Sequence, residues 1–173
     1  MSVTVTNQPS AFPEVVADAV RESIASSLGT ILGTAPVEGE SDPELRSLSR
    51  VLGVISMVGE GSWTVAFTFP EPTAVTLVQQ FCGFEIEFAA PEMGDAVGEL
   101  VNVVAGELVA QLEARQIKAQ MSLPMVARGK NVEVMMPAGL PSIDLNYLSE
   151  QGAFWVKLIA ARPGQSLGRR PGS

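Results

Sequence analysis

The residues best suited to chemistry lie on one face of a long helix that the sequence predicts from Pro91 to about Arg115. Successive helical residues are about 100° apart, so the face within about 40° of Asp95 can be read from the sequence. It carries acids, an amide and a glycine: Asp95, Glu99, Asn102, Gly106 and Glu113. A carboxylate can meet a cation, and a carboxamide both donates and accepts hydrogen bonds. This face therefore favours recognition of a charged group on another protein.

Two features of this face go beyond what a solvated helix surface needs. Asp95 and Glu99 are like charges four residues apart, which costs about 0.2–0.5 kcal/mol. Gly98 and Gly106 each cost about 1 kcal/mol relative to alanine inside a helix. Asp95, Gly98 and Gly106 would together form a flat, acidic contact surface that a partner's backbone could approach closely. Two alternatives remain open: an ordinary solvated face, and glycines that permit close packing inside the same domain.

The opposite side of this helix is an apolar stripe that other elements must cover. It comprises Val97, Leu100, Val101, Val104 and Leu108. Hydrophobic periodicity predicts further helices at 13–32 and 73–81. It predicts strand-like segments at 51–58, 62–69, 118–126, 131–136 and 153–161, with turns at 59–61 and 128–130. Residues 84–88 alternate in polarity and indicate a strand or an extended entry into the long helix.

The chain contains one internal repeat. Residues 18–29 align without gaps on residues 95–106, and five of the twelve positions are identical. Each copy is followed by two strand-like segments around a glycine-containing turn. We therefore expect two related halves, the second helix carrying a function that the first lacks.

Composition limits the class of protein. The 173 residues, of which 46% are apolar, suffice for one domain, expected at 11–161, with a flexible start at 1–10 and a disordered tail at 162–173. A net charge of −8 disfavours nucleic acid and anionic membranes as partners and favours a basic surface on another protein. Neither a signal peptide nor a membrane-spanning segment is evident, so we expect a cytoplasmic protein.

Several kinds of active site are excluded by residue content. Histidine is absent, which removes histidine-based triads, phosphohistidine relays and histidine metal sites. The single cysteine, Cys82, lies in an apolar stretch and is expected to be an inert reduced thiol. Glu85 and Glu87 would share one face of a strand, but nothing marks them as a catalytic dyad or metal site. We expect no metal ligands, and no nucleotide-binding loop is evident.

Two runs together resemble a known family. Residues 95–106 (Asp-Ala-Val-Gly-Glu-Leu-Val-Asn-Val-Val-Ala-Gly), followed by residues 121–129 (Met-Ser-Leu-Pro-Met-Val-Ala-Arg-Gly), resemble the CheX branch of the CheC/CheX/FliY chemotaxis phosphatases. The resemblance implies an α+β fold, an α/β sandwich in which an antiparallel sheet from two related halves packs with two long amphipathic helices. It also implies action on the aspartyl phosphate of a CheY-like receiver, and it suggests a homodimer.

The resemblance assigns the functional pair to Glu99 and Asn102. Asn102 would position the attacking water, and Glu99 would pair with a lysine of the receiver, which would also supply Mg²⁺. The chain would need no cofactor of its own. In the first half, Glu22 is followed by Ala25 where a second asparagine would stand, so one site is expected. The alternative is a non-catalytic CheX-like adaptor that binds a receiver or a flagellar motor protein.

Overall fold

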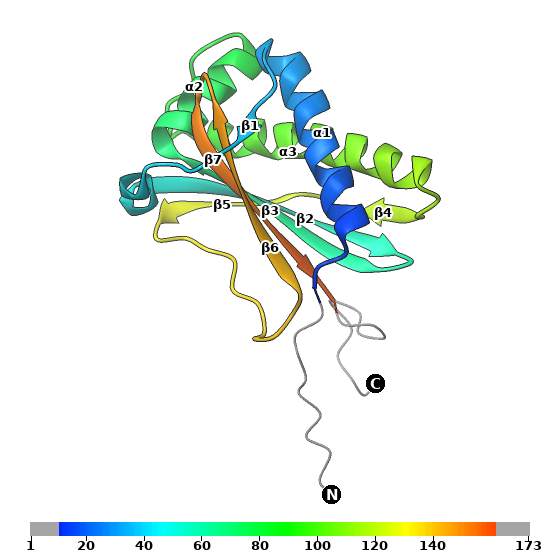
Figure 1. Cartoon of the computed structure of the whole chain (residues 1–173). Helices are drawn as coiled ribbons and strands as arrows, with labels where there is room; N and C mark the ends of the chain where they lie inside the picture. The colour runs from blue at the N-terminus through cyan, green and yellow to red at the C-terminus, as the bar shows by residue number, and fades with distance from the viewer. Residues whose placement is uncertain (1–10, 162–173) are drawn as a thin grey trace, which may run out of the picture.

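Three α-helices lie on one face of a seven-stranded antiparallel sheet in the computed structural model, which describes residues 11–161 (Figure 1). The predicted flexible start and disordered tail lie outside these residues. The helices are α1 (Glu14–Leu32), α2 (Glu71–Cys82) and α3 (Pro91–Ala114), with a 3₁₀ helix η1 (Pro43–Ser47). The strands are β1 (Val37–Glu38), β2 (Ser49–Gly59), β3 (Ser62–Pro70), β4 (Ala119–Met121), β5 (Met125–Lys130), β6 (Ser142–Ser149) and β7 (Gly152–Ala160).

The sheet joins the two predicted halves symmetrically. Its order is β1-β6-β7-β3-β2-β4, and β5 also pairs with β2. Each half supplies a long helix and a hairpin, β2–β3 in the first half and β6–β7 in the second, and the hairpins meet where β3 pairs with β7. Each half also adds an edge strand to the other, because β1 pairs with β6 and β5 pairs with β2. The predicted fold class, with its two related halves, is confirmed.

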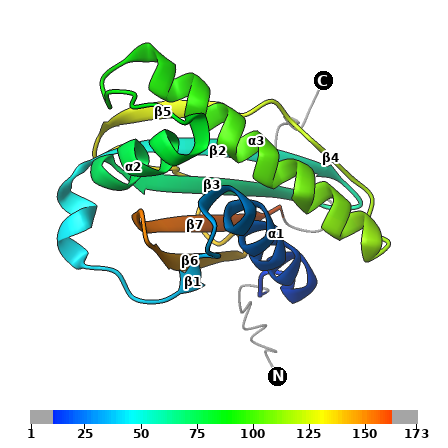
Figure 2. The ribbon, with the colours of Figure 1, turned by 90° about the horizontal axis from the view of Figure 1, so that it is seen from above.

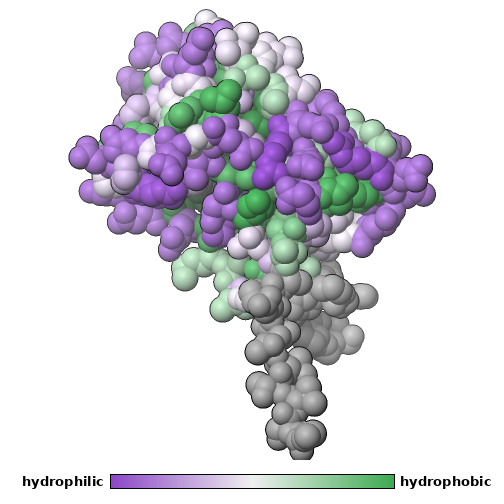
Figure 3. Space-filling model, viewed as in Figure 1, coloured by the Kyte–Doolittle hydropathy of each residue, from purple (hydrophilic) through white to green (hydrophobic). Residues whose placement is uncertain are grey.

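Figure 2 shows the helices from above, lying over the sheet. The hydrophobic core lies between these two layers. All five residues of the predicted apolar stripe of α3 are buried in it. Gly53 of β2 lets α3 approach the sheet, because a Cβ there would lie 2.6 Å from Cγ2 of Val101. On the surface shown in Figure 3, hydrophilic side chains predominate and separate smaller apolar patches.

The sequence predictions fail mainly in the second half. Residues 128–130 form no turn but belong to β5, where Gly129 pairs with Arg50 of β2. Residues 131–136 are not a strand but part of an irregular segment, on the side of the sheet away from the helices in Figure 1. The sequence prediction lacked strand β6, although its Ile143, Leu145 and Tyr147 alternate toward the helices. Residues 84–88 form no strand and lead irregularly into α3.

Candidate functional site

The acid and amide side chains of α3 are available to a partner. Asp95 and Glu99 are exposed, and Asn102, one turn further along, is half-buried. Within residues 11–161 none of these three side chains has a hydrogen-bond or ion-pair partner. Gly106 is also exposed, and a Cβ there would meet nothing within 4 Å. The polar face of the helix is therefore not used to hold the domain together.

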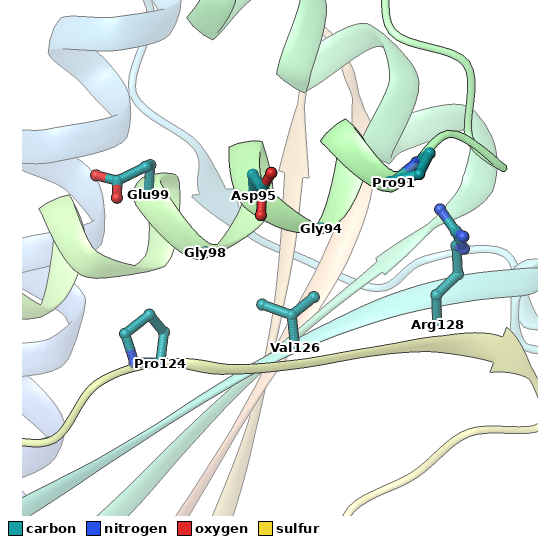
Figure 4. A pocket seen from close by; sticks show the side chains of 8 residues that line it. All are labelled: Pro91, Gly94, Asp95, Gly98, Glu99, Pro124, Val126 and Arg128. Carbon is teal, nitrogen blue, oxygen red and sulfur yellow. The ribbon is translucent and has the colours of Figure 1, made fainter.

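A groove of about 730 Å³ runs beside this face, between α3 and β5 (Figure 4). Asp95 and Glu99 project from the helix above it. Pro124, Val126 and Arg128 line the strand side below. The two sequence runs that carried the family resemblance thus form the opposite walls of one groove.

Gly98 differs from the expectation of an exposed contact residue. It is buried, and a Cβ there would lie 3.6 Å from Cγ2 of Val126 and 3.9 Å from Cγ of Pro124. A side chain at this position would therefore face β5 and the residues before it, but an alanine would fit, so packing within the domain does not require glycine here. These distances are ordinary van der Waals contacts, and Gly98 lines the groove. A role of Gly98 in partner binding stays a prediction.

Arg128 is a site residue that the sequence reasoning missed. Its Nη1 donates to the carbonyl oxygens of Phe88 at 2.6 Å and Ala90 at 2.7 Å, immediately before α3 begins. Its guanidinium also lies 5.8 Å from the centre of the Phe88 ring. Arg128 thereby ties β5 to the start of α3 and fixes one end of the groove. Arg128 belongs to residues 121–129, the second run that resembles the family, but the Arg-Gly-Lys sequence at 128–130 suggested a turn.

The equivalent positions on α1, in the first half, differ in their side chains and contacts. Glu22 and Ala25 occupy the positions equivalent to Glu99 and Asn102, and both are exposed. The Glu22 carboxylate is engaged by Arg115 at 2.7 Å, whereas Glu99 is unpaired among the described residues. The first half therefore offers neither the amide nor a free acid.

Comparison with known proteins identifies the family. The family model "Chemotaxis phosphatase CheX" matches residues 51–147, which is more than half of the chain. The chain belongs to the CheX family. No curated protein matches it in sequence.

Solved structures similar to this CheX-family chain support the fold. A CheC-like superfamily protein from Shewanella sp. PV-4 is 23% identical with a TM-score of 0.74, covering 87% of this chain and 100% of that one. CheX from Desulfovibrio desulfuricans is 22% identical with a TM-score of 0.72, covering 84% and 99%. CheX from Borrelia burgdorferi, solved in a complex with CheY, BeF₃ and Mg²⁺, is 19% identical with a TM-score of 0.64, covering 87% and 97%.

The chemistry open to this CheX-family site is that of carboxylates and an amide. Within residues 11–161 no group of three or more acidic or cysteine side chains is arranged to hold a metal ion. The Cys82 thiol is half-buried and lies outside the groove. Among the helices of residues 11–161, none has the length and hydropathy of a membrane-spanning segment. The Glu99 carboxylate can form an ion pair with a cation, and the Asn102 carboxamide can orient a water molecule through hydrogen bonds.

Proposed function

We propose that this CheX-family protein hydrolyses the aspartyl phosphate of a CheY-like receiver through Glu99 and Asn102. The observation that carries the proposal is the pair itself, three residues apart on α3 and without partners among the described residues. Glu99 lines the groove, whereas Asn102 does not line it and lies one turn further along the helix. Membership of the CheX family supports a chemotaxis phosphatase. The Borrelia CheX–CheY complex supports a CheY-like receiver as the partner.

The chemistry explains why an amide suffices. An aspartyl phosphate is an acyl phosphate with a good carboxylate leaving group. Hydrolysis therefore needs mainly a water molecule held in line with the phosphorus and compensation of the charge on the transferring group. The Asn102 carboxamide can accept a hydrogen bond from that water and donate one to it. A carboxylate there would place a negative charge beside the phosphoryl oxygens and repel the substrate.

Glu99 would fix the position of the receiver. An exposed ion pair contributes only about 0–1 kcal/mol, but pairs desolvated at an interface can be coupled by about 1.5 kcal/mol or more. Asp95, one turn before Glu99 and also unpaired within residues 11–161, would add to the negative potential that attracts a receiver lysine. Gly106, exposed further along the same face, would let the receiver backbone approach the helix.

The receiver would supply the positive charge that the reaction requires. We assign Mg²⁺ to the receiver, where it would neutralise the phosphoryl oxygens; the Borrelia complex, which contains Mg²⁺, supports this assignment. This chain would bring the water-positioning amide to the phosphoryl group while Glu99 holds the receiver lysine. The active site would therefore be completed only in the complex.

The second candidate function is a CheX-like adaptor that binds a receiver or a flagellar motor protein without catalysis. The unpartnered Asn102 amide disfavours it, because binding alone does not require that group. A direct assay separates the two functions: a panel of phosphorylated receivers is mixed with the full chain, and loss of the phosphoryl group is followed over time. We expect faster loss from at least one receiver. Binding without faster loss would support the adaptor.

A further inference from the structure

A cluster of cations lies on the face of the sheet away from the helices. Side chains alternate along a strand, and because Val51 of β2 and Val156 of β7 are buried in the core, Arg50 and Lys157 point to the opposite face. Arg46 of η1 and Trp155 of β7 join them there. We call this place the back pocket; it is a cavity of about 140 Å³ whose charged and aromatic lining residues are Arg46, Arg50, Glu133, Asp144, Trp155 and Lys157.

Two guanidinium groups share one aromatic ring in the back pocket. The Arg46 Cζ lies 4.7 Å from the centre of the Trp155 ring, and the Arg50 Cζ lies 5.8 Å from it. Arg46 also donates to Oδ1 of Asn146 at 3.2 Å. Arg50 donates to the carbonyl oxygens of Arg46 and Leu48. The two like charges are therefore held together by an aromatic face and by neutral acceptors.

Neither guanidinium has a carboxylate partner among the described residues. Arg21 and Arg115 form ion pairs with acids, as does Lys157, whose Nζ lies 3.5 Å from Oδ1 of Asp144. Glu133 lines the back pocket but forms no ion pair with Arg46 or Arg50. The chain has eight more acidic than basic residues, yet none of the described acids forms an ion pair with either arginine. With three cations and two acids among its lining residues, the back pocket carries a net charge of +1.

One donor of Arg50, a residue that lines the back pocket, lacks an acceptor. The Arg50 Nε is shielded from solvent and has no hydrogen-bond partner. A buried donor without a partner costs free energy, and an acceptor would recover this cost once a shift of the Arg50 side chain let it reach the Nε. Guanidinium groups bind phosphate and carboxylate oxygens through paired N–H donors, more specifically than ammonium groups do.

We propose that the back pocket binds a small oxyanion, a phosphate or carboxylate group, between Arg46 and Arg50. Typical small-molecule sites have volumes of about 300–1,000 Å³, so a cavity of about 140 Å³ suits a charged group of a few heavy atoms. A neighbouring cavity of about 330 Å³ shares Glu133, Val134 and Lys157 with the back pocket, so the remainder of a larger ligand would extend there. This site is separate from the proposed phosphatase site, and either can fail without the other.

The test is a titration of the full, ¹⁵N-labelled chain with inorganic phosphate and, separately, with acetate, at constant ionic strength. The two tryptophan indole signals provide an internal comparison, because Trp155 lies in the back pocket and Trp63 lies in the core on the helix side. We expect phosphate to move the Trp155 signal along a saturating curve and to leave Trp63 unchanged. Saturation by acetate as well would assign a general carboxylate or phosphate site, and saturation by phosphate alone would assign a phosphate site.

Matched variants decide whether the arginines form the site. Arg46 is exposed, so Arg46→Gln should leave the fold intact and weaken oxyanion binding at least tenfold. Lys118→Gln removes an exposed cation that lies outside the back pocket and should leave the affinity unchanged. A linear, non-saturating response of Trp155 to both anions would overturn the proposal. So would equal affinities of the two variants.

Discussion

Arg115, immediately after α3, holds the carboxylate of Glu22 on α1 at 2.7 Å. Glu99, which is the equivalent of Glu22 in the second half, has no such partner among the described residues. The two halves share a fold, but the equivalent acids differ. Glu22 forms an ion pair in the first half, whereas Glu99 has no partner among the described residues. This asymmetry agrees with a single site and makes a direct prediction for the first half.

Restoring the missing amide should not create a second site. In an Asn102→Ala background, Ala25→Asn should leave the dephosphorylation rate within about twofold of the background variant. Two further differences explain this expectation: Glu22 is engaged by Arg115, and Arg21, ion-paired with Glu14, Asp18 and Glu38, stands where the second half has Gly98. The rate is measured on the phosphorylated receiver. Recovery to near the wild-type rate would show that the amide alone had been lacking.

Removing the charge of Glu99 should weaken receiver binding. Loss of a desolvated ion pair of about 1.5 kcal/mol or more predicts at least about a tenfold higher Kd for Glu99→Gln, and a larger loss for Glu99→Lys. The difference from wild type should shrink at high salt, because salt screens the attraction that the variants lack. Titration of a labelled phosphorylated receiver at low and high salt measures both effects. Glu71→Gln removes an exposed acid on α2 outside the groove, so it is the matched control and should bind normally.

Gly53 should be required for the position of α3. A Cβ at this residue would lie 2.6 Å from Cγ2 of Val101, so Gly53→Ala should lower the free energy of unfolding by about 1–3 kcal/mol through overpacking. Val101→Ala in the same chain should recover part of the loss by removing the clashing methyl. Urea unfolding measures these changes. Gly94→Ala is the control, because a Cβ there would meet nothing within 4 Å and alanine favours the helix. Additive losses from Gly53→Ala and Val101→Ala would contradict the proposed contact.

The sequence was sufficient for the parts of this fold that are periodic and buried. The stripe of α3 is apolar on one side because that side meets the sheet, and the β2–β3 hairpin is marked by its glycine turn. Strand β5 was misassigned because it lies beside β2 at the margin of the sheet, where Arg128 and Lys130 are exposed and the apolar pattern is weak. The irregular segment that follows carries apolar residues without forming a strand, and that misled the strand assignment at 131–136.

The candidate site was likewise only partly predictable from the sequence. The face with Asp95, Glu99 and Asn102 follows from helical spacing alone, because residues three and four apart share a side. The burial of Gly98 and the contact of Arg128 with the start of α3 depend on which strand lies beside the helix. That is set by pairing between β2 and β5, distant in sequence, which no local pattern encodes. The roles of Glu99 and Asn102 in catalysis remain predictions.

The single tyrosine should make stability sensitive to alkaline pH. Burial raises the pKa of Tyr147, and the charge of Glu38 adds to the shift, while Arg21 opposes it. The unfolded chain releases the phenolic proton near pH 10, whereas the folded chain retains it, so stability should fall as the pH rises above about 10. Tyr147→Phe should remove this component, as measured by urea unfolding at pH 8 and above pH 10. Equal pH dependence in both proteins would show that the phenol ionises as readily folded as unfolded.

The central claim is that Asn102 acts on water during the reaction and not on receiver affinity. The measurement is single-turnover loss of phosphate from a phosphorylated receiver saturated with the full chain, for wild type and Asn102→Ala, with receiver Kd measured in parallel. Val103→Ala, an exposed neighbour on α3, serves as the control for shortening a side chain there. We predict that Asn102→Ala keeps Kd within about twofold while the rate falls by about 10² or more. A saturated rate equal to that of wild type would contradict the account.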